Sequence, residues 1–74
     1  MNASTTPAIP IDLNGEPHAA RAGTTVRVLV RETLQLQDDR IAIELNRRLL
    51  PRAEWDRPLA PGDRLEIVTF VGGG

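Results

Sequence analysis

The sequence predicts an α+β domain in which one helix covers a mixed sheet of four to five strands. Several segments alternate apolar and polar residues with the period of a strand, whereas residues 26–34 carry apolar side chains at helical spacing. The chain has 74 residues, which suffice for one small core. A single helix can cover only one face of the sheet, and this excludes a doubly wound arrangement.

The first predicted element is a β-hairpin. The segment "IPIDL" alternates apolar and polar side chains from Ile9 to Leu13 and runs into Asn14-Gly15, a pair that favours the tight two-residue turn of hairpins. The return strand, residues 16–21, contains a proline and few large apolar residues. We therefore expect it at an edge of the sheet, where a missing backbone donor is tolerated.

The second predicted element is the helix. Thr24 or Thr25 is placed to cap its N-terminus, because a hydroxyl can accept a hydrogen bond from a free amide of the first turn. Arg27, Arg31 and Glu32 are expected to face water. The apolar stripe on the other side comprises Val26, Leu29, Val30, Thr33 and Leu34.

Two or three further strands complete the prediction. The segment "IAIEL", residues 41–45, returns to a period of two and points its aliphatic residues inward. The apolar pair Leu49-Leu50 suggests a short strand, residues 61–63 form a turn, and the final strand begins at Leu65. This order of elements predicts the β-grasp fold, in which the first and last strands lie side by side in the middle of the sheet.

Side chains in the segment between Leu50 and the final strand, and in the first hairpin, are interpreted as structural. We expect Trp55 to cover a satellite cluster with Leu49 and Leu59 rather than to bind a ligand. Arg52 is expected to be solvated or locally paired. His18, in the edge strand, is expected to be solvated, and it has no carboxylate or nucleophile at motif spacing that would make it a general base.

The composition excludes several classes of function. The chain has no cysteine and one histidine, so disulfides, a zinc cluster or other metal site, and a thiol nucleophile are not expected. Nine basic and ten acidic residues give a net charge of -1, which argues against nucleic acid or an anionic membrane as a partner. No stretch approaches the ~20 apolar residues of a membrane span, and no signal peptide is evident, so a cytoplasmic location is expected.

The last three residues, Gly72, Gly73 and Gly74, are the strongest functional feature. Glycines cannot add to a core and are costly to order, but they form a thread thin enough to enter another protein's active site. The alternative is a frayed end without function. We divide the chain into a flexible segment, residues 1–8, a β-grasp domain, residues 9–71, and a flexible glycine tail.

A terminal carboxylate on such a thread would need activation, since it is a poor electrophile. A partner enzyme that uses ATP could convert Gly74 to an adenylate, and sulfur could then displace AMP to leave a thiocarboxylate. The protein itself would bind no cofactor and contribute no catalytic residue. Val68 and Phe70 share the parity of Glu66, away from the helix, and are expected to form an exposed apolar docking surface beside the tail. The alternative is a strand end that is buried on both faces.

The sequence resembles the ThiS family of ubiquitin-like sulfur carriers over residues 9–74. The segments that carry the resemblance are "NGEP", "AGTTVRVLV", "AIELNRRLLPRAEW", "PGDRLEIVTFV" and the final "GGG". The motif positions that match in order are Asn46, Pro51, Arg52, Trp55, Gly62, Asp63, Gly73 and Gly74. Two departures are a longer N-terminus and a third glycine at the end.

The resemblance implies a protein co-substrate rather than an enzyme. It implies that an E1-like adenylyltransferase of the ThiF type adenylates Gly74, that a cysteine desulfurase provides the sulfur, and that a thiazole synthase of the ThiG type receives it for thiamine. One alternative is a carrier for another pathway, such as the small subunit of molybdopterin synthase or a cysteine-type carrier. Another is a β-grasp binding module that carries nothing.

Overall fold

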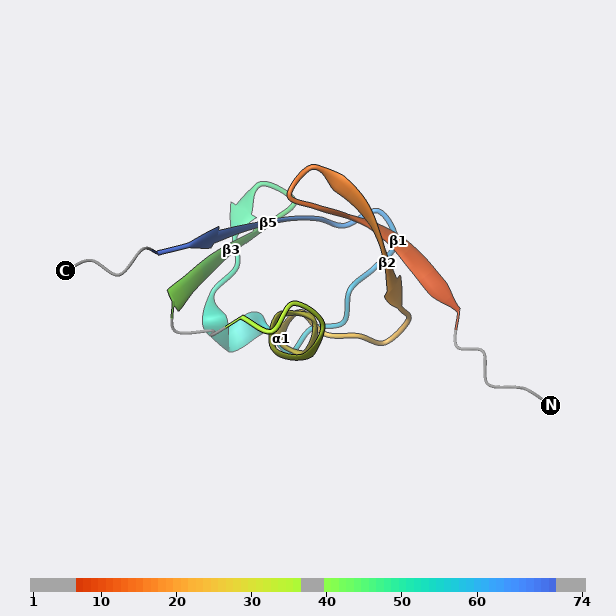
Figure 1. Ribbon diagram of the computed structural model, residues 1–74, viewed down its shortest axis with the longest axis horizontal. Coiled ribbons are helices and arrows are strands. Elements are labelled where there is room, and N and C mark those ends of the chain that lie inside the picture. The colour runs from red at the N-terminus through yellow and green to blue at the C-terminus, as the bar shows by residue number, and fades with distance from the viewer. Residues whose placement is uncertain (1–6, 37–39, 71–74) are drawn as a thin grey trace.

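The computed structural model describes residues 7–36 and 40–70, and in this part of the chain a five-stranded mixed sheet arches over one helical segment (Figure 1). The strand order is β2-β1-β5-β3-β4; β1 and β5 are parallel and the other neighbours are antiparallel. This confirms the predicted β-grasp fold. The strands are β1 (Ala8–Leu13), β2 (Glu16–Arg21), β3 (Ile41–Leu45), β4 (Arg48–Leu49) and β5 (Arg64–Thr69).

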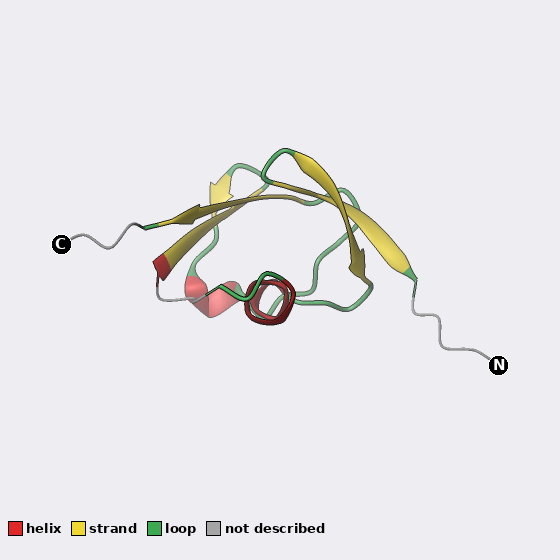
Figure 2. Cartoon of the chain, viewed as in Figure 1, coloured by secondary structure: helices red, strands yellow, loops and turns green. Residues whose placement is uncertain are grey.

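The helical parts lie on one side of the sheet only (Figure 2). They are α1 (Val26–Val28), η1 (Leu29–Thr33) and a short 3₁₀ turn, η3 (Arg52–Glu54). The concave face of the sheet packs against the helix, and the convex face, which we call the open face, has no described element over it. Among the described residues, the open face is therefore the face of the sheet that no helix covers.

The β1–β2 hairpin forms as predicted. Leu13 pairs with Glu16 across a two-residue turn, and β2 lies at the edge of the sheet. Both turn residues have positive φ, 53° at Asn14 and 84° at Gly15. This backbone conformation matches the twist of the two strands, and asparagine and glycine adopt it at the lowest cost.

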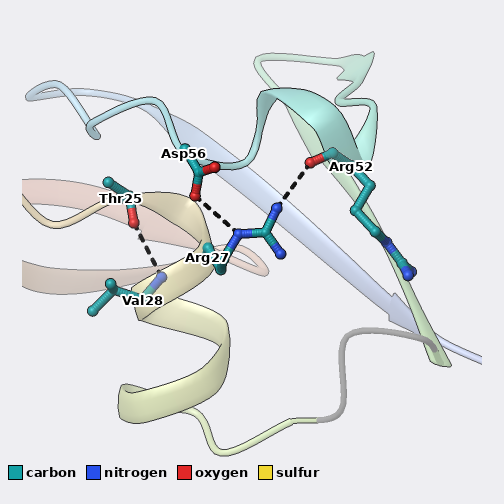
Figure 3. A network of polar contacts seen from close by, with 5 residues as sticks. All are labelled: Thr25, Arg27, Val28, Arg52 and Asp56. Atoms are coloured by element: carbon teal, nitrogen blue, oxygen red, sulfur yellow. Dashed lines mark hydrogen bonds and ion pairs between the residues drawn. The ribbon is translucent and has the colours of Figure 1, made fainter.

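The helix begins at the predicted cap. The Thr25 side chain accepts a hydrogen bond from the Val28 N–H at 3.1 Å (Figure 3). The next free amide of the first turn, that of Arg27, donates to the carbonyl of Trp55 at 2.9 Å. The connection between β4 and β5 thus provides acceptors that the start of the helix cannot find within itself.

The second half of the helix differs from the prediction. After α1 the helix widens into a π-helical turn, in which the Leu34 N–H donates to the Leu29 carbonyl at 2.9 Å, five residues back. In an α-helix Thr33 would follow Leu29 on the buried face, whereas a wider turn brings Leu34 there instead. Accordingly Thr33 is exposed and Leu34 is partly buried, so the placement of Thr33 in the apolar stripe was wrong.

The hydrophobic core fills the space between the concave face and the helix. Every strand except β4 contributes to it, and the aliphatic residues of β3 point inward as predicted. The buried members are Ile11, Ala20, Val26, Leu29, Val30, Ile41, Ile43, Leu45, Leu50, Trp55, Leu59 and Leu65. None of the buried residues in the described part of the chain is charged or polar.

Trp55 is a central member of this core, not the lid of a separate cluster as predicted. Its side chain is 2% exposed, and its indole N–H donates to the Leu50 carbonyl at 3.1 Å. The guanidinium groups of Arg27 and Arg52 lie over the ring, 5.7 and 5.1 Å from its centroid. Arg27 also donates to the Asp56 carboxylate at 2.9 Å and to the Arg52 carbonyl at 3.2 Å, which joins the helix to η3 (Figure 3).

The predicted packing of Leu49 against the tryptophan is also wrong, because a second tight turn reverses its direction. Asn46 and Arg47 have φ of 52° and 72°, the conformation of a two-residue hairpin turn. This turn pairs Leu49 with Glu44, which points outward, so Leu49 lies on the open face and is 68% exposed. Its neighbour Leu50 takes the place in the core.

Candidate docking surface at the end of the last strand

The exposed end of β5 is the candidate site. Val68 is 53% exposed and Phe70 is 56% exposed, whereas Leu65 is buried and Ile67 is partly buried against the core. The predicted exposure of Val68 and Phe70 on the open face is thus confirmed, and the alternative of a strand end buried on both faces is excluded. Their role in docking stays a prediction. Gly72, Gly73 and Gly74 lie outside the described residues.

Two asparagines hold β5 from its two sides. On the β1 side, the Asn14 N–H donates to the Leu65 carbonyl at 2.8 Å, and the Asn14 side-chain oxygen accepts from the Ile67 N–H at 2.8 Å. On the β3 side, the Asn46 N–H donates to the Arg64 carbonyl at 2.8 Å, and its side-chain oxygen accepts from the Arg64 N–H at 2.9 Å. The position of β5 is therefore fixed by both hairpin turns.

The turn that leads into β5 is fixed by the same network. The Asn46 amide donates to the Asp63 carboxylate at 3.1 Å, and this carboxylate also accepts from the Ala60 N–H at 2.8 Å. Gly62 has a φ of 85°, and its N–H donates to the Pro10 carbonyl of β1 at 2.7 Å. The positions matched by resemblance in this region thus share one structural task, which is to set the register at which the last strand starts.

The open face over the first half of β5, before its apolar end, carries both acidic and basic side chains. Glu66 lies directly opposite Glu44 of β3, and Arg64 lies opposite Asp12 of β1. A hollow at this place is lined by these four residues and by Arg47, among others. With three acidic and two basic side chains it has no strong electrostatic preference, so the apolar end of β5 is the more distinctive surface.

Other classes of site find no support in the described ranges. Among these residues, no group of three His, Cys, Asp or Glu side chains is placed to hold a metal ion. No helix in this part of the chain is long and apolar enough to cross a bilayer. His18, expected to be solvated, is half-buried on the edge strand opposite Ile11.

Comparison with known proteins agrees with this geometry. The family model described as the ThiS family matches residues 9–74. Among solved structures, the crystal structure of the thiamine biosynthesis protein ThiS from Geobacter metallireducens superimposes with a TM-score of 0.72 at 28% sequence identity, covering 89% of this chain and all of that one.

Curated relatives are of two kinds. A thiazole synthase of Magnetococcus marinus is 40% identical over 65 residues, which are 86% of this chain and 20% of that protein. An uncharacterized protein of Porphyra purpurea, ycf40, is 39% identical over 67 residues, which are 89% of this chain and 93% of that protein. The chain thus spans about a fifth of the length of the thiazole synthase it matches and nearly all of ycf40.

Proposed function

This chain belongs to the ThiS family, and on that premise we propose that it is a sulfur carrier for the thiazole of thiamine, with Gly74 as the residue that carries the sulfur. The observation that supports the proposal best is the place of β5. This strand is fixed in the middle of the sheet, exposes Val68 and Phe70 at its end, and is followed in sequence by four residues that finish in three glycines.

The proposed chemistry takes place at the Gly74 carboxylate, in the active sites of partner enzymes. A carboxylate oxygen attacks the α-phosphorus of ATP and pyrophosphate leaves, which gives an acyl-adenylate. The terminal sulfur of a partner's persulfide then attacks the acyl carbon, AMP leaves, and an acyl disulfide forms. A second thiolate attacks the partner's sulfur, so that a disulfide forms and the thiocarboxylate is released.

The domain would contribute binding and reach to this chemistry rather than catalysis. Four extended residues beyond Phe70 span at most about 14 Å, so the partner's reacting atoms must lie within that distance of the place where Phe70 docks. The partners proposed are an E1-like adenylyltransferase, a sulfur donor such as a cysteine desulfurase, and a thiazole synthase. The similarity to the thiazole synthase of Magnetococcus marinus supports the last of these.

Intact-mass spectrometry tests the proposal. The chain is incubated with a ThiF-type adenylyltransferase, ATP and a cysteine desulfurase with cysteine, and we expect the mass gain of one oxygen replaced by sulfur. Two controls keep the folded domain and change only the end: one chain stops at Val71, and the other carries an aspartate after Gly74. Equal behaviour of all three chains would exclude sulfur carriage and favour a β-grasp module that carries nothing. Transfer to thiazole synthase in a reconstituted reaction distinguishes thiamine from other pathways.

A further inference from the structure

The backbone of β5 directs its hydrogen bonds alternately to its two sides. The Phe70 N–H donates to the Arg40 carbonyl at 2.7 Å, and the Arg64 carbonyl accepts from the Asn46 N–H at 2.8 Å. Both contacts lie on the β3 side. Because this alternation has a period of two, the even-numbered residues of β5 direct their backbone groups toward β3 along the whole strand.

The odd-numbered residues direct their backbone groups to the β1 side. The Leu65 carbonyl accepts from the Asn14 N–H, and the Ile67 N–H donates to the Asn14 side chain. The register between β1 and β5 ends at Leu65, and β1 turns away at Asn14. The N–H of the next odd residue, Thr69, and the carbonyl of Ile67 therefore point past the end of β1, where no described strand lies beside them.

From this arrangement we propose that a strand of the adenylating partner adds to β5 on its β1 side, and that it pairs with the Thr69 N–H and the Ile67 carbonyl. Such an added strand would lie about 4.8 Å away and would continue the sheet along the chain that leads to Gly74. The inference rests on the proposed function, since it assumes that an enzyme acts on the C-terminus.

Two properties of the surroundings favour a protein strand over other occupants. The unpaired groups are backbone donors and acceptors at a sheet edge, which an extended peptide satisfies in full. The side chains of Val68 and Phe70 project on the open face next to this edge, so that pairing of the backbone and apolar contact would occur on one partner surface. A strand placed here would also hold the residues after Phe70 extended toward the partner's active site.

The test is Thr69→Pro, compared with Thr69→Ala. Proline removes the N–H that points away from β3 and leaves the ladder between β3 and β5 intact, so the domain should fold in both variants. We expect similar thermal transitions for the two variants, and a kcat/KM for adenylation, measured by ATP–pyrophosphate exchange, that is about tenfold lower for Thr69→Pro than for Thr69→Ala. A third variant, Val68→Pro, tests whether the even-numbered residues of β5 direct their backbone groups toward β3. It removes an N–H that is directed at β3, and it should therefore unfold the domain.

Equal rates for folded Thr69→Pro and Thr69→Ala would overturn the inference. If Thr69→Pro does not fold, backbone hydrogen exchange of the unaltered chain decides instead: the Thr69 amide should become protected when the adenylating enzyme binds without ATP, and unchanged exchange would overturn the inference. Failure of the proposed function is distinguishable, because in that case neither the unaltered chain nor Thr69→Ala is adenylated.

Discussion

Asn14 and Asn46 occupy equivalent positions in two different hairpins and bind opposite sides of the same strand. Each is the first residue of a two-residue turn, with φ of 53° and 52°, and each side-chain oxygen accepts an N–H of β5. An asparagine suits both tasks at once, because it tolerates the left-handed backbone and carries an acceptor that can reach a neighbouring chain. The two turns therefore act together on the strand that leads to the candidate site.

The first prediction separates these two tasks at Asn46. Asn46→Gly keeps the favoured backbone but removes the acceptor of the Arg64 N–H, and because this hydrogen bond is exposed we expect the free energy of unfolding to fall by about 0.5 to 1.5 kcal/mol. Asn46→Ala should cost about 1 kcal/mol more, because alanine is strained at positive φ. Chemical denaturation followed by circular dichroism measures both values. Equal free energies of unfolding for Asn46→Gly and Asn46→Ala would mean that alanine is not strained at the positive φ of this turn.

The second prediction concerns the buried tryptophan. Trp55→Phe removes the N–H that is bonded to the Leu50 carbonyl and leaves that acceptor buried, so the free energy of unfolding should fall by about 1 to 3 kcal/mol. Trp55→Ala adds a cavity and should cost about 3 to 5 kcal/mol, enough to unfold a domain of this size. Since Trp55 is the only tryptophan, its fluorescence also reports global unfolding of the unaltered chain. A neutral Trp55→Phe would contradict a structural role for the indole hydrogen bond.

Much of the fold is predictable because local signals and the global arrangement agree. The pair Asn14-Gly15 specifies its turn, and the inward residues of β3 follow from a period of two. The helix starts at Thr25, which is one of the two threonines predicted to cap it. The exposure of Val68 and Phe70 follows in the same way, since it depends only on parity along a strand and on the presence of a single helix.

The errors share a physical cause, which is a local change of backbone geometry that composition does not signal. A π-helical turn shifts Thr33 out of the buried face. The pair Asn46-Arg47 forms a tight turn without a glycine, and the resulting register places Leu50 in the core and Leu49 on the open face. A shift of one residue along a strand moves every later side chain to the other face of the sheet, so the register that this turn sets decides which of the two leucines is buried.

The third prediction is that the ion pair on the helix side contributes little. Asp56 is 75% exposed on its side chain, so water screens its contact with Arg27. Asp56→Asn should therefore lower the free energy of unfolding by less than about 1 kcal/mol. Arg27→Ala should cost more, because the side chain also packs over Trp55 and donates to the Arg52 carbonyl. Thermal unfolding at low and high salt tests both variants, and a larger loss for Asp56→Asn would contradict the expectation.

The fourth prediction tests docking at the end of β5 with a matched pair of exposed apolar residues on the open face. Phe70 is 56% exposed at the end of β5, and Leu49 is 68% exposed on β4. Neither Phe70→Ser nor Leu49→Ser should change the thermal transition by more than a few degrees, since both remove surface contacts only. If partners bind beside the tail, Phe70→Ser should lower kcat/KM for adenylation about tenfold or more while Leu49→Ser leaves it nearly unchanged. A collapsed thermal transition in Phe70→Ser would show that Phe70 belongs to the core, and equal rates for both variants would show that the partner does not dock at the end of β5.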